Sequence, residues 1–271
     1  MDNVLLNKEY RRYVGPVEFY DIVSGLQFII LFLLGLREEH FLLDIGCGSL
    51  RGGKLLIPYL LPNRYYGIEP NEWLIKEGIN NEIGNDMINI KKPSFSKVSD
   101  FTLSVFNLKF DFILAQSIFS HAAPTQIRKC LSEAKKVMKP TSLFVATFME
   151  GNDDYKGNKW VYPGCVTYTL NTIYKMCGEY GLNCKKIDYP HPNGQTWIVI
   201  HFPENESSIL SILYKDKLKE IFNMKALEDS LHTCKERLSR LESHPYVKVG
   251  LKIRRFFLKF KQHFDKIYNK K

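Results

Sequence analysis

A short apolar run that enters a glycine turn, at residues 41–53, constrains the fold of this chain more than any other feature. The run ends at Asp44, and Gly46 and Gly48 follow before a helical pattern begins. Glycine suits a tight turn beneath a ligand, because it has no Cβ to strike the ligand or to restrict the backbone angles. Dinucleotide sites share this layout, but Arg51 stands where their third glycine would fall, which disfavours a pyrophosphate site.

The pattern continues as an alternation of strands and helices. The second strand ends in Glu69, 25 positions after Asp44, and a helix opens at Asn71, a residue typical of helix N-caps. Proline is expected to open one later helix at Pro124 and to stop it at Pro140. We predict strands at 40–46, 64–69, 94–99, 110–116 and 142–149, then a helix at about 170–180 and a hairpin of 183–189 with 195–202.

Four of these elements resemble the class I S-adenosylmethionine (SAM)-dependent methyltransferases, in the same order along the chain. They are the glycine turn, the strand ending in Glu69, the strand at 110–116, and the helix and strand at 131–148. The resemblance covers roughly residues 40–202. It implies an α/β, Rossmann-like sheet of parallel strands with a C-terminal antiparallel hairpin strand, followed by a helical C-terminal extension. It also implies SAM as the cofactor.

The resemblance assigns cofactor contacts residue by residue. The acid Asp44 would engage the glycine loop or the methionine amino group, and Gly46 and Gly48 would let the backbone approach the methionine part. Glu69 would pair with both ribose hydroxyls, while Asn71 would help to hold the ribose or only cap its helix. The remaining expected contacts are Asp100 and Phe101 at the adenine, and Gln116 and Ser117 beside the sulfonium methyl.

Gln116 departs from the family, which often has an acid near this position. The chain has no Asn-Pro-Pro-Tyr-like motif either, which argues against an exocyclic base amine as the acceptor. The carboxylates Glu150, Asp153 and Asp154 follow the fifth predicted strand and could hold a divalent ion. A solvated loop is the favoured interpretation, so we predict no metal site.

Two histidines are candidates for the catalytic base. His121 follows the strand at 110–116, and an alcohol acceptor gains from an imidazole that takes its proton. A capping or packing role is the alternative. His191 lies in the hairpin loop and is the weaker candidate, whereas His201 falls within a strand and is expected to be structural.

Charge is concentrated at the C-terminus. The whole chain has a formal charge of +9, and residues 244–271 hold nine lysines and arginines against one aspartate, a net charge of +8. The remainder is almost neutral, so we expect no nucleic-acid groove in the catalytic part and no nucleic-acid partner. The aromatic and basic pattern of 244–271 fits an anchor on an anionic membrane surface, with a helix docked on its own domain as the alternative.

We therefore divide the chain into four predicted parts. These are an N-terminal helical cap at 1–39, a SAM-binding core at 40–203, a helical segment with a coiled-coil-like pattern at 204–243, and a basic amphipathic tail at 244–271. Leucines and a cysteine repeat at coiled-coil spacing within 227–241, which suggests a route to a homo-oligomer. The apolar run at 26–36 has only 11 residues, and we expect a buried helix there and not a membrane span.

The predicted function is O-methylation of a sugar, glycan or glycan precursor in bacterial surface-polysaccharide biosynthesis. This substrate class is inferred from the tail, from aromatic residues around the expected pocket, and from general similarity to methyltransferases of those pathways. The alternatives are a methyltransferase of a soluble small metabolite and a non-catalytic scaffold of the same fold. Scattered single cysteines suit a reducing cytosol, so we expect a cytoplasmic protein, held at the inner face of the membrane if the tail is an anchor.

Overall fold

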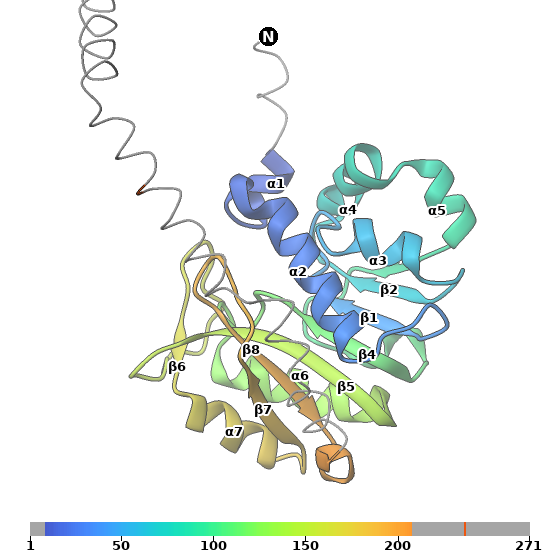
Figure 1. Cartoon of the computed structure of the whole chain (residues 1–271). Coiled ribbons are helices and arrows are strands. Elements are labelled where there is room, and N and C mark those ends of the chain that lie inside the picture. The colour runs from blue at the N-terminus through green and yellow to red at the C-terminus, as the bar shows by residue number, and fades with distance from the viewer. Residues whose placement is uncertain (1–8, 208–235, 237–271) are drawn as a thin grey trace, which may run out of the picture. The chain divides into compact units, whose positions relative to one another are not determined.

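The computed structural model describes residues 9–207 and Glu236. The first compact unit of the chain spans Met1–Lys215, and the described part of it holds a sheet with helices on both faces (Figure 1). The predicted segments 204–243 and 244–271 lie outside the described residues, apart from 204–207 and Glu236. The strands are β1 (Leu42–Ile45), β2 (Tyr65–Ile68), β3 (Ser94–Ser96), β4 (Phe110–Ala115), β5 (Met138–Glu150), β6 (Thr167–Tyr168), β7 (Asn183–Ile187) and β8 (Thr196–His201).

The sheet has the order β3-β2-β1-β4-β5-β8-β7, with β6 paired to β5 outside this path. The pairs from β3 to β5 are parallel, and β8 is antiparallel to both β5 and β7. The predicted Rossmann-like sheet, with an antiparallel strand from a C-terminal hairpin, is therefore confirmed. The order in which strands are added to the sheet reverses between β1 and β4. Open α/β sheets bind ligands at such a switch point.

The helices cover the sheet in two layers. In Figure 1, α2 and α3 lie in front of the sheet, and α6 lies behind it. The helices are α1 (Glu9–Tyr13), η1 (Val17–Phe19), α2 (Tyr20–Leu33), α3 (Gly53–Tyr59), α4 (Glu72–Gly78), η2 (Ile79–Ile83), α5 (Asn85–Lys91), η3 (Leu103–Phe106), α6 (Pro124–Val137), α7 (Leu170–Gly178) and η4 (Pro203–Asn205).

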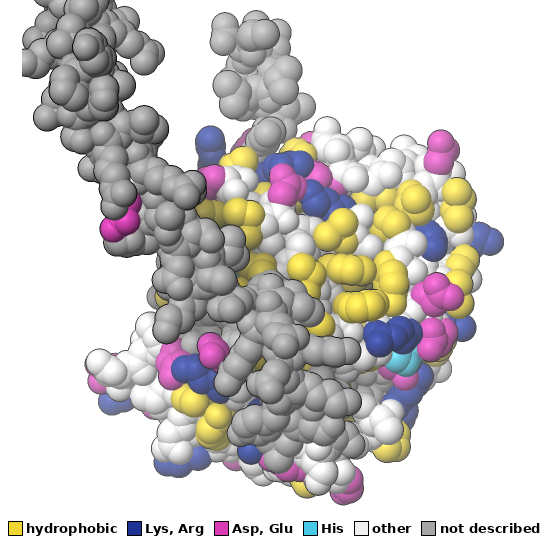
Figure 2. Space-filling view, in the orientation of Figure 1, with side chains coloured by type: hydrophobic (Ala, Val, Ile, Leu, Met, Phe, Trp, Pro, Cys, Tyr) yellow, Lys and Arg dark blue, Asp and Glu magenta, His cyan; other side chains and the backbone are white. Residues whose placement is uncertain are grey.

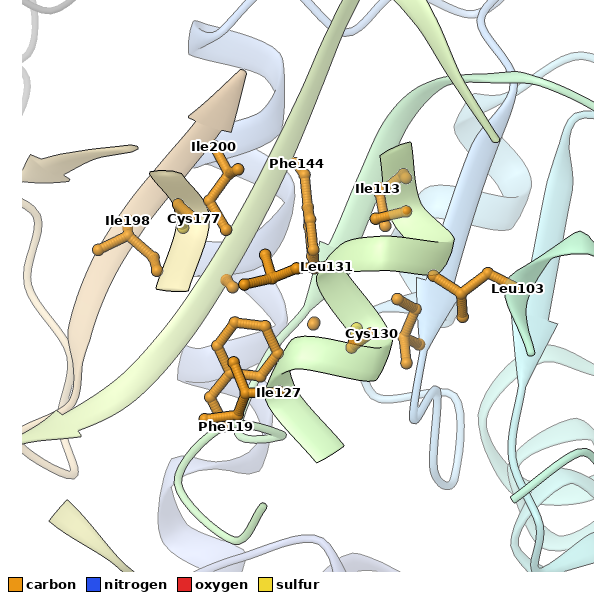
Figure 3. Packing of buried hydrophobic residues seen from close by; sticks show 14 of the residues in the cluster. Leu103, Ile113, Phe119, Ile127, Cys130, Leu131, Phe144, Cys177, Ile198 and Ile200 are labelled. Carbon is orange, nitrogen blue, oxygen red and sulfur yellow. The ribbon is translucent and has the colours of Figure 1, made fainter. Parts of the chain in front are cut away.

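The larger hydrophobic core lies beneath α6 and α7. Alternate residues of the strands point to this face, because successive side chains of a strand face opposite sides of the sheet. Ile113, Phe144 and Ile198 meet Leu131 of α6 and Cys177 of α7 in this cluster (Figure 3). The apolar runs that predict the strands thus owe their length to burial on both faces of the sheet.

The junction between α6 and β5 differs from the prediction. The helix ends at Val137 and not at Lys139, and Pro140 lies inside the long strand β5. Phe110 pairs with Met138 but Phe112 pairs with Leu143, so the register is irregular there. Proline lacks the N–H that a regular ladder needs, and an irregularity of this kind accommodates it.

The chain between β2 and β3 also contains more structure than predicted. A π-helical turn, η2, follows α4, and α5 precedes the short strand β3. Neither has a fully buried residue, so the hydrophobic signal for both is weak.

Gly78, the last residue of α4, packs against the backbone of Ser49, directly after the glycine turn. A Cβ added there would come within 2.6 Å of the Ser49 carbonyl carbon, which is closer than real Cβ atoms approach backbone. We expect Gly78→Ala to lower the free energy of unfolding by about 1–3 kcal/mol, as overpacking does. Urea unfolding would measure the change.

Gly178 provides the matched control, because it ends α7 and an added Cβ would find nothing within 4 Å. Gly178→Ala should leave the free energy of unfolding unchanged or raise it by up to about 1 kcal/mol. Equal stabilities for the two variants would contradict the packing argument.

Hydrophobic side chains gather on part of the surface in Figure 2, and Ile22 and Phe32 of α2 and Leu55 of α3 are exposed. Residues 26–33 of the apolar run at 26–36 form the second half of α2, where Ile30 and Leu31 are buried and Phe32 is not. Among the described residues, no helix is long and apolar enough to cross a membrane.

Candidate active site

The carboxyl ends of β1, β2 and β4 lie side by side, so the segments that follow them meet at one edge of the sheet. A cavity of about 590 Å³ opens there, within the size range of small-molecule sites. Its walls also include the N-terminal residues 12–16 and part of the loop after β5. Predicted site residues that line it are Gly46, Gly48, Glu69, Asn71, Phe101, Gln116, Ser117 and His121.

The glycine turn after β1 packs closely against other parts of the protein. Gly46 and Gly48 have φ values of 69° and 54°, in the region that favours glycine. A Cβ at Gly46 would overlap the side chain of Ile118, and one at Gly48 would lie 2.7 Å from Cγ1 of Val14. The sequence suggested that a Cβ would strike a ligand, whereas the nearest obstacles are these two side chains.

Glu69 directly follows β2, and its buried carboxylate connects the loop after β2 to the glycine turn after β1. Oε1 accepts hydrogen bonds from the Asn71 backbone N at 2.8 Å and from Asn71 Nδ2 at 2.9 Å. Oε2 accepts one from the Gly48 N at 3.1 Å. Burial raises the pKa of Glu69, and these hydrogen bonds oppose that rise. Asn71 occupies the N-cap position of α4, but its side chain holds Glu69 instead of capping the helix.

Asp44 lies deeper than Glu69, in a recess of about 20 Å³ that adjoins the cavity. The Tyr65 hydroxyl donates to its Oδ2 at 2.6 Å. Burial raises the pKa of Asp44 to about 6, although the hydrogen bond from Tyr65 and the charge of Arg51 both oppose the rise. Asp44 is therefore a buried acid whose ionisation is disfavoured by its surroundings.

Gln116 and Ser117 end β4 in a polar network. Gln116 Oε1 accepts hydrogen bonds from Arg51 and, at 3.3 Å, from Gln27 Nε2. The Ser117 backbone N donates to Thr147 Oγ1 at 2.7 Å, and Gln195 Nε2 donates to Ser117 Oγ at 2.8 Å. These bonds hold Ser117 at a φ of 61°, which is uncommon for a residue other than glycine.

His121 is a buried residue of the cavity wall, with a defined tautomer. Its Nδ1 lies 2.9 Å from the Val161 carbonyl oxygen and 2.7 Å from the Gly164 carbonyl oxygen. Because carbonyl oxygens only accept, Nδ1 carries a hydrogen, and in the neutral imidazole the lone pair is then on Nε2. The rings of Trp160 and Tyr162 both pack 5.4 Å from the imidazole, measured between ring centroids.

His191 lies behind Gln116 and is not part of the cavity wall. Its Nε2 is 3.0 Å from Gln116 Nε2, and burial together with the charge of Arg51 lowers its pKa to about 4. These contacts suit a residue that positions Gln116. A catalytic role for His191 stays a prediction.

Asp100 and Phe101 separate in the structure. Asp100 is exposed and accepts hydrogen bonds from the Thr102 N at 3.0 Å and from Thr102 Oγ1 at 2.9 Å, which lowers its pKa. Phe101 has a φ of 60° and lines the cavity. The apolar half of the predicted adenine contact therefore faces the cavity, while the acid stabilises the turn.

Two of the predicted carboxylates at the end of β5 have hydrogen-bond partners within the protein. Glu150 Oε2 accepts hydrogen bonds from Lys186 Nζ at 2.7 Å and Thr196 Oγ1 at 2.8 Å. Asp154 accepts from the Thr169 N at 2.7 Å, next to the start of α7. Within residues 9–207, no group of three or more metal-ligating side chains is gathered in one place.

Several residues of the site were not predicted. The side chain of Val14 and the amides of Gln27 and Gln195 reach the site from distant parts of the chain, and no local pattern marks them. The sequence position of Arg51, next to the glycine turn, argues against a pyrophosphate site but does not indicate a role for the side chain.

The comparisons with known proteins agree with this geometry. Residues 43–146, from β1 into β5, match the family model described as a methyltransferase domain. A SAM-dependent methyltransferase from Clostridium acetobutylicum ATCC 824 is 14% identical, with 74% of this chain and 97% of that chain covered and a TM-score of 0.52. Residues 43–146 therefore match a methyltransferase domain, and the sheet has the Rossmann-like fold of class I methyltransferases.

Other solved structures share this fold. The magnesium protoporphyrin IX methyltransferase of Synechocystis PCC 6803, solved with bound SAM, is 15% identical, covers 73% of this chain and 96% of its own, and has a TM-score of 0.52. A glycopeptide N-methyltransferase solved with SAM is 8% identical, covers 66% and 94%, and has a TM-score of 0.51. The family match and the fold support a SAM-dependent methyltransferase with SAM as its cofactor.

The chemistry of the site fits that cofactor. The buried carboxylate of Glu69 suits the two hydroxyls of a ribose, and Val98, Phe101 and Leu103 supply apolar cavity wall for a base. Asp44 lies beyond the glycine turn, where an ammonium group would find a carboxylate. These assignments of individual residues are predictions.

Affinity for S-adenosylhomocysteine (SAH), the demethylated cofactor, should rise with pH up to about 6. The charged and titratable groups facing Asp44 are Tyr65, Arg51, Glu69 and Cys47, and burial keeps the pKa of Asp44 near 6 in the ligand-free protein. An ammonium group needs the ionised form, so affinity should increase by up to about tenfold per pH unit below 6 and then level off. Calorimetric titration over this range would measure the slope.

Asp44→Asn is the control, because Glu69 also has a raised pKa and shifts affinity in the same direction. The slope should flatten in this variant, and an unchanged slope would remove Asp44 from the ammonium site. Without ligand the sign is opposite. The folded protein keeps a proton that the unfolded chain releases near pH 4, so Asp44 lowers the free energy of unfolding as pH rises from about 4 to 6.

Proposed function

We propose that this protein transfers the methyl group of SAM to a hydroxyl of a glycan or glycan precursor during assembly of a bacterial surface polysaccharide. The preference for an oxygen acceptor is inferred from the hydrogen bonds of His121. Two carbonyl oxygens fix the hydrogen on Nδ1, which leaves Nε2 ready to take a proton. An alcohol needs such a base as its oxygen begins to attack, whereas a neutral amine can attack before it loses a proton.

SAM supplies a methyl group made electrophilic by the sulfonium. In the proposed step the acceptor oxygen forms the new bond to the methyl carbon, and the electrons of the carbon–sulfur bond return to sulfur. The hydroxyl proton passes to Nε2 of His121. Trp160 and Tyr162 pack against the imidazole, and the hydrogen bonds of Nδ1 keep the ring in place.

The cavity wall supports a sugar as the acceptor. Tyr13, Trp160 and Tyr162 line the cavity, and the Tyr13 and Tyr162 rings lie 5.1 Å apart. Aromatic faces with polar edges suit the apolar faces and hydroxyls of a sugar ring. Planar aromatic acceptors would use the same surface, so a soluble small metabolite is the alternative acceptor.

The test is transfer of labelled methyl from SAM to a panel of acceptors. The panel should contain sugar nucleotides, lipid-linked saccharides, oligosaccharides and catechol-type small molecules. We expect labelled product from a saccharide and none from the aromatic metabolites. Product from the small molecules alone would overturn the glycan assignment, and cofactor binding without turnover on any acceptor would favour a scaffold.

The proposal also places the protein in the cytoplasm, at the inner face of the membrane. It rests on the sequence of 244–271, which lies outside the described residues. Each lysine or arginine near an anionic surface contributes roughly 1 kcal/mol of binding, and interleaved aromatic residues add burial. Charges at this density oppose insertion across the hydrocarbon, so a surface anchor is the form that we propose.

Sedimentation with vesicles tests the anchor. The full chain should bind vesicles that contain an anionic lipid, release them in high salt, and ignore neutral vesicles. A chain that ends at residue 244 should lose vesicle binding and keep its SAH affinity. Equal vesicle binding by both chains would contradict the anchor, and loss of SAH affinity on truncation would favour a helix docked on the domain.

The segment 227–241 is proposed as a homo-oligomer contact on sequence spacing alone, and it too lies outside the described residues except for Glu236. Analytical ultracentrifugation of the full chain and of a chain ending at residue 226 would test this. A single shared mass would contradict it.

A further inference from the structure

Arg51 is a buried cation at the edge of the site. Arg51 follows the glycine turn and is only 7% exposed. Nη1 donates to the Val14 carbonyl oxygen at 2.6 Å, and Nη2 donates to Gln116 Oε1. Arg51 therefore joins the N-terminal residues to the end of β4 across the base of the cavity.

The hydrogen-bonding capacity of Arg51 is not filled. Both of these acceptors are neutral oxygens, and Nε is buried without a hydrogen-bond partner among the described residues. A buried donor of this kind carries a penalty, and a buried charge with neutral partners carries a larger one. Burial lowers the pKa of Arg51 to about 10, so the guanidinium is still positive at neutral pH. Among the described residues, no carboxylate accepts a hydrogen bond from the guanidinium, so an anionic partner would suit it.

The surroundings of Arg51 indicate what kind of ligand brings that anion. Arg51, Gly48 and Gln116 line both the main cavity and the adjoining recess, and Asp44 lines the recess. A negative and a positive side chain therefore meet in one small space beside the glycine turn. A ligand end that carries an ammonium and a carboxylate complements this pair, whereas a simple anion would be repelled by Asp44 in its ionised form.

We infer that Arg51 binds the α-carboxylate of the methionyl part of SAM. The inference rests on SAM as the cofactor of this site and assigns one charged group of that cofactor to one side chain. Arginine presents parallel N–H groups to a carboxylate, so it can form two charge-assisted hydrogen bonds where a lysine forms one. Binding would fill unused donors of the guanidinium and neutralise its charge.

An anionic group of the acceptor is the other possible source of a carboxylate at this position. The two sources predict different affinities for cofactor analogues measured without an acceptor. If Arg51 serves the cofactor, it discriminates between SAH and an analogue without the carboxylate when no acceptor is present. If Arg51 instead binds the acceptor, it does not discriminate between these two ligands.

The experiment measures dissociation constants of two ligands by calorimetry. They are SAH and decarboxylated SAH, which keeps the adenosine, the thioether and the amino group. Wild-type protein should prefer SAH by about 10- to 100-fold, the range expected for hydrogen bonds between charged groups. In Arg51→Gln this preference should fall to about threefold or less, and in Arg51→Lys it should be intermediate.

Arg12→Gln is the matched control, because Arg12 lines the same cavity but is exposed. It removes the same charge and should leave the preference for SAH unchanged. Binding of decarboxylated SAH by Arg51→Gln, with an affinity close to that of the wild type, shows that the variant is folded. If that variant fails to fold, Arg51→Lys carries the comparison.

An unchanged preference for SAH in both Arg51 variants would overturn the inference and point to the acceptor. An equal loss of preference in Arg12→Gln would also overturn it, since the effect would then be general electrostatics. Failure of the wild type to bind either ligand would instead sink the assignment of SAM to the site. The two failures are therefore distinguishable.

Discussion

Replacing His121 by asparagine should lower the turnover number by about 10²- to 10⁴-fold and leave the affinity for SAH almost unchanged. The amide of asparagine can keep a donor near the place of Nδ1, where the Val161 and Gly164 carbonyl oxygens accept. It has no nitrogen that accepts a proton, so the expected loss is the usual contribution of a general base. Single-turnover transfer of labelled methyl to the identified acceptor would measure it.

His201→Asn is the control for this variant. His201 is also buried, and its Nδ1 lies 2.8 Å from the Phe202 carbonyl oxygen, but it belongs to β8 and is not part of the cavity wall. Its substitution should leave the turnover number unchanged, whatever it does to stability. A fall in turnover of less than about tenfold for His121→Asn would move the base elsewhere, with His191 as the next candidate.

The second large effect is expected at Glu69. Glu69→Ala removes the carboxylate proposed for the ribose hydroxyls and also leaves the Gly48 and Asn71 N–H groups without their acceptor. Charge-assisted hydrogen bonds contribute about 1–3 kcal/mol, so the affinity for SAH should fall by about 5- to 150-fold. Calorimetry would give the affinity, and thermal unfolding would show how far the loops depend on this residue.

Glu72→Ala is the matched change, three residues further on. Glu72 is exposed and pairs with Lys97 at 2.6 Å and with Lys76 at 3.4 Å. Surface pairs of this kind contribute little, so neither the SAH affinity nor the unfolding temperature should change much. If Glu69→Ala binds SAH as tightly as Glu72→Ala does, the ribose assignment is wrong.

The elements that could be predicted are those in which local sequence and burial agree. The strands β1, β2 and β4 are mostly apolar, apart from Asp44 and Asp111, because both faces of the sheet are covered, and each is followed by a glycine turn or a polar residue. The sequence predicts the end of α6 two residues too late, because a proline such as Pro140 usually stops a helix. The irregular register at the start of β5, which tolerates a proline, depends on pairing with β4 and leaves no local mark.

Prediction of the site had a similar limit. Glu69 follows a strand and its position could be predicted, since the end of a strand also fixes the edge of the sheet. The partners of Gln116 could not, because Gln27, Arg51 and His191 reach it from three separate segments. Asp100 shows the reverse case, in which a plausible spacing leads to an exposed side chain that binds its own turn.

The contact between Tyr13 and Tyr162 has a consequence for acceptor binding. The Tyr162 hydroxyl donates to the Tyr13 carbonyl oxygen, so the N-terminal segment and the loop after β5 are tied together beside the cavity. The same two rings form part of the wall that an acceptor would meet. A ligand large enough to separate these rings must also break this hydrogen bond, so the strength of one contact between distant segments enters the energy of acceptor binding.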